Sequence, residues 1–138
     1  MRLVVAGRYS PGNDNTGVQP QTTAPLETDS GAEKLELLKG YAVAIYYFSL
    51  ANAQLAIRRV KLRVALGGHN VPSDIVKRRF GRSLRNFFAL YAPLADEWTL
   101  FDNSSSPQAL PVATQFANQL TVTETATWHK LQKLSKVV

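Results

Sequence analysis

A chain of 138 residues, 45% hydrophobic and 19% charged, is long enough to form one domain with a buried core, which excludes a disordered or fibrous protein. The absence of cysteine excludes disulfides and thiolate metal sites, and the longest apolar run, Tyr41 to Phe48, falls far short of the roughly 20 residues of a membrane-spanning helix. The net charge of +6 is local: residues 58–85 hold nine of the sixteen basic residues and a single acidic one, so the chain is not uniformly basic.

The first 40 residues carry weak structural signals. Residues 3–6 predict a short buried strand, whereas glycines and prolines without apolar periodicity indicate loop or disorder over residues 7–25. A polar helix is expected over residues 30–39, with Gly40 as its stop. Neither a membrane span nor a signal-peptide core is found in the sequence, and we expect a cytoplasmic protein.

The apolar run over residues 41–48 predicts a strand. It is rich in β-branched and aromatic residues and does not alternate with polar ones, which is typical of a strand covered on both faces. We therefore expect an α/β fold with a parallel sheet flanked by helices.

Two helices are predicted on either side of a glycine-rich loop. Ser49 or Asn52 can cap the first, which extends to about residue 66 and carries two apolar stripes, so we expect it to be covered on two sides. After residues 67–72, Ser73 can cap the second, which extends to about Tyr91 before Pro93 stops it.

The C-terminal part predicts three further elements. These are a short strand over residues 98–101 with a turn at 102–104, an alternating stretch around residues 116–122, and an amphipathic helix holding Trp128, Leu131 and Leu134. We expect the last two to be structural.

The basic segment is the main candidate site. Arg59 and Arg63 precede the loop Gly67-Gly68-His69-Asn70, and four further arginines follow it: Arg78, Arg79, Arg82 and Arg85. Guanidinium groups match phosphate oxygens in shape and charge, so closure of this loop as a lid would bring both sets toward one anion. The alternative is that the arginines form only a solvated helix face.

Other residues give weaker signals. Asp102 and Asn103, at the end of a predicted strand, can contact a nucleotide or substrate or can simply form a turn. No histidine or carboxylate pair has the spacing of metal ligands, and we predict no intrinsic metal site. Gly7 and Gly12 have the spacing of a phosphate loop, but Asn13 and Asp14 occupy the positions of its lysine and its serine or threonine. We interpret this stretch as a degenerate or coincidental loop.

Much of the chain resembles the zeta toxin family of P-loop kinases. The resemblance is carried by residues 57–64, 67–72, 78–80 and 83–88, and it continues through residues 94–96, Trp98 and residues 101–104. Residues 27–31 are similar to the Glu-Thr-Thr segment in the middle of that fold. The resemblance therefore implies a C-terminal kinase portion over residues 27–138, behind a disordered or eroded leader over residues 1–26.

The resemblance also implies an activity. Members of the family are α/β kinases that use ATP with Mg²⁺, and its toxins phosphorylate UDP-N-acetylglucosamine. The resemblance therefore implies a nucleotide and a sugar nucleotide as ligands and allows an antitoxin as a partner. By resemblance, Arg59, Arg63, Arg79 and Arg82 bind phosphate, and Arg63 and Arg79 act in catalysis. Because the phosphate-loop unit is missing or degenerate, we expect a truncated kinase of weak or no activity.

Two alternatives stay open at this point. The chain can be an inactive remnant or a fragment that depends on a partner, such as a complementary N-terminal half. It can also be a basic nucleic-acid-binding protein, although Phe80, Phe87 and Phe88 lie on the predicted inner stripe and leave no aromatic ladder for bases.

Overall fold

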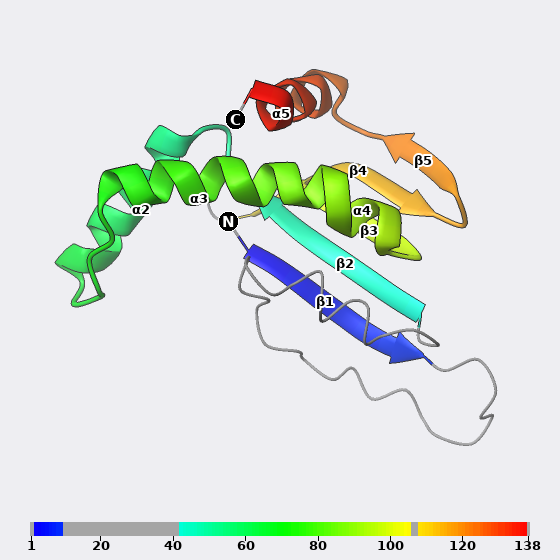
Figure 1. Ribbon diagram of the computed structural model, residues 1–138, viewed down its shortest axis with the longest axis horizontal. Helices are drawn as coiled ribbons and strands as arrows, with labels where there is room; N and C mark the ends of the chain where they lie inside the picture. Colours follow the sequence, from blue (N-terminus) through cyan, green and yellow to red (C-terminus); the bar gives the residue numbers. More distant parts are fainter. Residues whose placement is uncertain (1, 10–41, 106–107, 138) are drawn as a thin grey trace.

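The computed structural model describes residues 2–9, 42–105 and 108–137 and shows an α/β fold. Its five-stranded sheet has the order β1-β2-β3-β4-β5, and helices α3 and α5 pack on one face of the sheet (Figure 1). The strands are β1 (Arg2–Tyr9), β2 (Ala42–Ser49), β3 (Glu97–Asp102), β4 (Leu110–Phe116) and β5 (Gln119–Val122).

Within the described residues, the helices lie between β2 and β3 and after β5. They are α2 (Ala53–Ala65), α3 (Ser73–Asn86), the π-helical turn η1 (Phe87–Tyr91), α4 (Ala92–Leu94) and α5 (Thr125–Val137). The Asn52 side chain caps α2 by accepting a hydrogen bond from the Leu55 amide. Asn52 is one of the two residues that the sequence predicted as the cap. By contrast, Ser73 is the first residue of α3 and not its cap, since Pro72 precedes the helix and no side chain caps it.

The prediction of a parallel sheet is correct for one strand pair only. β2 and β3 are parallel, whereas the β1–β2, β3–β4 and β4–β5 pairs are antiparallel, so the sheet is mixed. The physical reason is the length of the connections. The helices between β2 and β3 carry the chain back across the sheet, while the short turn at Ala117 and Asn118, both with positive φ, folds β4 and β5 into a hairpin.

Within the described residues, the prediction that residues 41–48 are covered on both faces is met on one face only. Val43, Ile45, Tyr47 and Ser49 are buried under the helices, and the residues between them are more accessible. The other face of β2 and β3 carries a stacked pair, Phe48 and Phe101, with ring centroids 4.9 Å apart. Aromatic residues occupy both faces of β2, so the apolar run did not reveal that only one face lies under α3 and α5.

An aromatic column forms the centre of the core. The Phe87 ring stacks on Tyr47 at 4.4 Å and meets Trp98 edge-on at 5.4 Å, and Trp98 stacks on Trp128 at 5.9 Å. These rings come from β2, η1, β3 and α5. The expected inward stripes of the second and last helices are thus confirmed by Phe87 and Trp128.

Helix α2 projects beyond the sheet beside α3 (Figure 1). Among its residues only Ile57 is buried, whereas Leu62 is 63% exposed, and Leu66, which follows the helix, is 80% exposed. The prediction that both apolar stripes of this helix are covered is therefore wrong. Among the described residues its main neighbour is α3, and one helix covers one stripe.

The N-terminal predictions are only partly within the described residues. Residues 2–9 form the edge strand β1, and its register with β2 shifts between Ala6 and Arg8, at Gly7. Gly7 thus lies within a strand, while the remaining residues of the phosphate-loop-like stretch, the predicted helix over 30–39 and most of the predicted leader lie outside the described residues. In the part of the chain that is described, no helix has the length and apolar character needed to cross a membrane.

Candidate functional site

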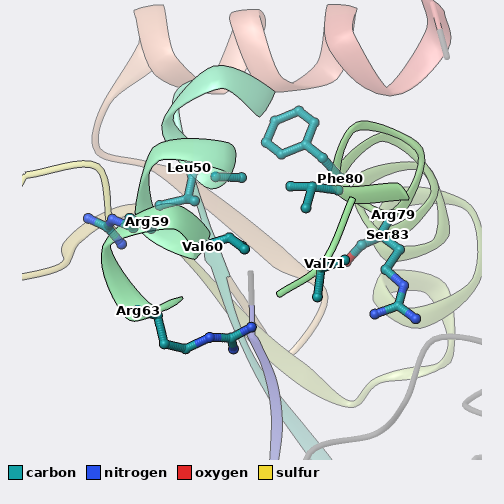
Figure 2. Close-up of a pocket in the computed structure, with 10 residues that line it drawn as sticks. Leu50, Arg59, Val60, Arg63, Val71, Arg79, Phe80 and Ser83 are labelled. Atoms are coloured by element: carbon teal, nitrogen blue, oxygen red, sulfur yellow. The ribbon is translucent and has the colours of Figure 1, made fainter. Parts of the chain in front are cut away.

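A cavity of about 390 Å³ lies between α2 and α3, beyond the C-terminal end of β2 (Figure 2). Its apolar lining consists of Leu50, Ala56, Val60, Val71, Val76 and Phe80. Its polar lining consists of Arg59, Arg63, Arg79 and Ser83. Open α/β sheets bind ligands beyond the carboxyl ends of their parallel strands, and this cavity adjoins the end of β2, which is parallel to β3.

Arg63 is held over the cavity by the loop that follows α2. One of its terminal nitrogens (Nη2) donates a hydrogen bond to the carbonyl oxygen of His69 at 3.3 Å, and the Gly68 amide donates to the Arg63 carbonyl at 2.9 Å. A Cβ atom at Gly68 would come within 2.7 Å of Arg63 Cγ and 2.9 Å of its carbonyl oxygen. Gly67 has a φ of +90°, a conformation that glycine adopts without steric cost. The double glycine therefore lets the loop close against Arg63.

Arg79 lies on the opposite wall, in α3. Figure 2 shows Arg63 extending across the opening toward the side on which Arg79 lies, with Val71 between them. Both arginines are exposed at the rim, while Phe80 and Val76 are buried beneath them. Two cations at the mouth of an apolar cavity can bind an anion by charge-assisted hydrogen bonds.

Arg59 points away from the cavity (Figure 2). One of its terminal nitrogens (Nη2) donates to the carbonyl oxygens of Asn103 at 2.6 Å and Ser104 at 3.3 Å. Arg59 thus links α2 to the loop after β3, although its stem lines the cavity. The convergence expected of Arg59 and Arg63 on one anion is not seen in this conformation.

The turn after β3 is closed by its own hydrogen bonds. A carboxylate oxygen of Asp102 (Oδ1) accepts from the Ser104 amide at 2.9 Å and from the Ser104 hydroxyl. The Ser104 hydroxyl oxygen accepts from the Ala51 amide at 2.6 Å, and the Asn103 amide donates to the Ser49 carbonyl at 2.9 Å. Asp102 and Asn103 therefore fasten the ends of the two parallel strands to each other.

The cavity also reaches a buried hydroxyl pair. Ser83, 8% exposed, lies 3.1 Å from the hydroxyl of the fully buried Tyr47. Burial raises the pKa of Tyr47, against a smaller opposing effect of the bond to Ser83, and Tyr91 raises the pKa further. Tyr47 is therefore a neutral hydroxyl under the cavity.

The lining arginines were predicted from the sequence, whereas the apolar lining and Ser83 were not. Leu50 follows a strand, and Val76, Phe80 and Ser83 lie three or four residues apart on α3, which is the spacing of one helix face. That spacing could have placed Ser83 beside Phe80. Ser83 pairs with Tyr47, which is 36 residues away, and no local sequence pattern predicts such a contact.

The remaining predicted residues are separated from the cavity. Arg78 and Arg85 are exposed on α3, and the half-buried Arg82 does not contribute to the cavity lining. In the loop, the side chains of His69 and Asn70 are exposed. Within residues 2–9, 42–105 and 108–137, no group of three histidine, aspartate or glutamate residues could hold a metal ion.

Comparisons of this chain with protein-family models, curated proteins and solved structures find no match.

Proposed function

We propose that this protein binds a phosphorylated ligand at the rim of the α2–α3 cavity and that it descends from the zeta toxin type of ATP-dependent kinase. The supporting observation is the position of Arg63, which the Gly68–His69 loop holds over the cavity on the wall opposite Arg79. In this proposal Arg63 and Arg79 bind phosphate oxygens. The proposed acceptor is a sugar nucleotide similar to UDP-N-acetylglucosamine, and turnover is weak or absent.

The two guanidinium groups are suited to an anion such as phosphate. Guanidinium groups neutralise charge on phosphate, and ATP would bring such charge to Arg63 and Arg79 at the rim of the cavity. The described residues contain no carboxylate group set for Mg²⁺, so we derive no step through the metal. The chemistry assigned to this chain is therefore the binding and electrostatic stabilisation of a phosphoryl group, with Arg59 and Arg82 as further cations nearby.

Calorimetry with ATP, in the presence and absence of Mg²⁺, tests the proposal. We expect millimolar binding that falls about tenfold in Arg63→Ala and in Arg79→Ala, since a charge-assisted hydrogen bond contributes about 1.5–3 kcal/mol. Arg58→Ala and Arg78→Ala are the matched controls, because each removes the same charge from an exposed position of the same helix. Equal losses of ATP affinity in all four variants would show that ATP responds only to the overall positive charge and not to a specific site. Absence of ATP binding in the wild type would refute the proposal.

A second candidate is a fragment that requires a partner. It is favoured by the face of β2 and β3 that α3 and α5 leave uncovered, where Tyr46, Phe48 and Phe101 are half-buried. A complementary N-terminal half would cover this face and supply the missing phosphate loop. Co-expression with an intact zeta-type N-terminal half, followed by size-exclusion chromatography and a kinase assay, tests this candidate. A stable complex with restored turnover is the expected result, and separate elution would contradict it.

A further inference from the structure

The cavity below the two arginines is larger and more apolar than phosphate binding needs. Its volume of about 390 Å³ lies near the lower end of the range for small-molecule sites, about 300–1,000 Å³. Val60, Val71 and Phe80 line it beneath the guanidinium groups. An inorganic anion at the rim would leave this apolar surface in water, whereas a ring attached to the anion would cover it.

A single hydroxyl lies among these apolar groups. Ser83 and Tyr47 share one hydrogen bond, yet together they carry two hydroxyl hydrogens, so one hydrogen is not used between them. Ser83 lines the cavity, whereas Tyr47 is fully buried and does not. With Tyr47 as the donor, the remaining hydrogen belongs to Ser83 and can point into the cavity. The cavity then offers one hydrogen-bond donor at a depth that solvent hardly reaches.

From these two observations we infer a ring-binding subsite between α2 and α3, in which Ser83 determines specificity. The ligand is a small molecule that carries a phosphate and a planar ring with a hydrogen-bond acceptor at its far end. Its phosphate lies on Arg63 and Arg79, its ring lies against Val60 and Phe80, and its acceptor receives the hydrogen of Ser83. The phosphate end of this inference rests on the proposed function, while the ring end rests on the cavity itself.

Other ligand classes use the cavity less completely. An aliphatic anion, such as a fatty acid, would cover Val60 and Phe80 but would leave the Ser83 hydroxyl against methylene groups, at a cost in free energy. A polyphosphate or a nucleic-acid backbone would contact the arginines and leave the apolar lining empty. A ring with an acceptor is the chemistry that satisfies all three parts of the site.

Three probes separate the parts of the site: inorganic phosphate, phenyl phosphate and 4-acetylphenyl phosphate, which adds a carbonyl acceptor to the ring. NMR titration of the full chain measures each affinity. We expect phenyl phosphate to bind about tenfold more tightly than inorganic phosphate, because its ring leaves water. The acetyl derivative should gain about a further threefold or more from the hydrogen bond to Ser83.

The Ser83→Ala variant should lose only the advantage of the acetyl derivative over phenyl phosphate, since the ring and the phosphate keep their contacts. Ser73→Ala, at an exposed serine of the same helix, is the control and should keep that advantage. If Ser83→Ala does not fold, Val60→Phe provides the second test, because it fills a half-buried wall of the cavity. Val60→Phe should abolish the preference for phenyl phosphate over inorganic phosphate and leave inorganic phosphate binding unchanged.

The outcomes distinguish the inference from the proposed function. Equal affinities for inorganic and phenyl phosphate in the wild type, with binding that depends on Arg63, would overturn the ring subsite and leave the phosphate site standing. A preference for phenyl phosphate that survives Val60→Phe would also overturn it. If the wild type bound neither inorganic phosphate nor phenyl phosphate, both the proposed function and the inference would be refuted.

Discussion

The guanidinium group of Arg63 donates a hydrogen bond to the backbone carbonyl of His69, six residues further along the chain. The loop between α2 and α3 thus orients one of the two arginine side chains at the mouth of the cavity. The arrangement depends on Gly68, against which the Arg63 side chain and backbone both pack. Loop conformation and anion binding should therefore respond together to changes in this segment.

The Gly68→Ala variant tests that dependence. A methyl group at this position would lie 2.9 Å from the Arg63 carbonyl oxygen, and because that atom is backbone the helix end must shift. We expect a loss of about 1–3 kcal/mol in the free energy of unfolding by urea and a weaker affinity for ATP. Asn70→Ala, at an exposed position of the same loop, should change neither quantity. Wild-type stability in Gly68→Ala would contradict the tight packing against Arg63.

The Arg59→Met variant tests the link between α2 and the loop after β3. Methionine keeps most of the apolar stem but removes the donor to the carbonyl oxygens of Asn103 and Ser104. We expect a loss of about 1–3 kcal/mol in the free energy of unfolding, measured in urea. The control is Arg58→Met, whose side chain is exposed on the same helix. If the two variants were equally stable, the contact with the loop would not contribute to the fold.

The aromatic column makes a prediction about the core. Phe87→Ala removes the ring that stacks on Tyr47 and meets Trp98, and the cavity it leaves is fully buried. We expect a loss of about 3–5 kcal/mol, read from the midpoint of chemical denaturation. Phe116→Ala removes the same ring from a position that is 64% exposed and should cost far less. Similar losses in both variants would show that Phe87 is not part of a packed core.

The buried Tyr47 hydroxyl predicts how stability changes in alkaline solution. An unfolded tyrosine ionises near pH 10.0, whereas burial raises the pKa of Tyr47 in the folded protein well above that value. Above pH 10 the unfolded state therefore binds fewer protons than the folded state, and stability falls as the pH rises. The fall due to this one group approaches about 1.4 kcal/mol per pH unit.

Urea unfolding of the wild type and Tyr47→Phe at several pH values between 9 and 11 measures this effect. Tyr47→Phe should be less stable at pH 9, because it loses the bond to Ser83, and it should show a shallower decline above pH 10. Parallel slopes in the wild type and Tyr47→Phe would show that Tyr47 does not titrate differently on folding.

Local signals in the amino-acid sequence were enough to place most elements within the described residues. The side chain of Asn52 and the backbone freedom of Gly67 define the two ends of α2 through contacts with residues a few positions away. The strand around Trp98 and the helix around Trp128 follow in the same way from short-range periodicity. The concentration of positive charge beside residues 67–72, and hence the candidate site, is likewise a property of neighbouring residues.

Only tertiary packing decided which surfaces are covered and where the cationic side chains point. The alternating burial of β2 and the turn of Arg59 toward Asn103 depend on neighbours distant in the chain. The pairing of Ser83 with Tyr47 has the same origin. The exposure of Leu62 reflects that, among the described residues, the main neighbour of α2 is α3. The periodicity of the side chains shows which face of a helix or strand is apolar. Which element covers that face is decided by the free energy of packing between segments that are distant in the chain.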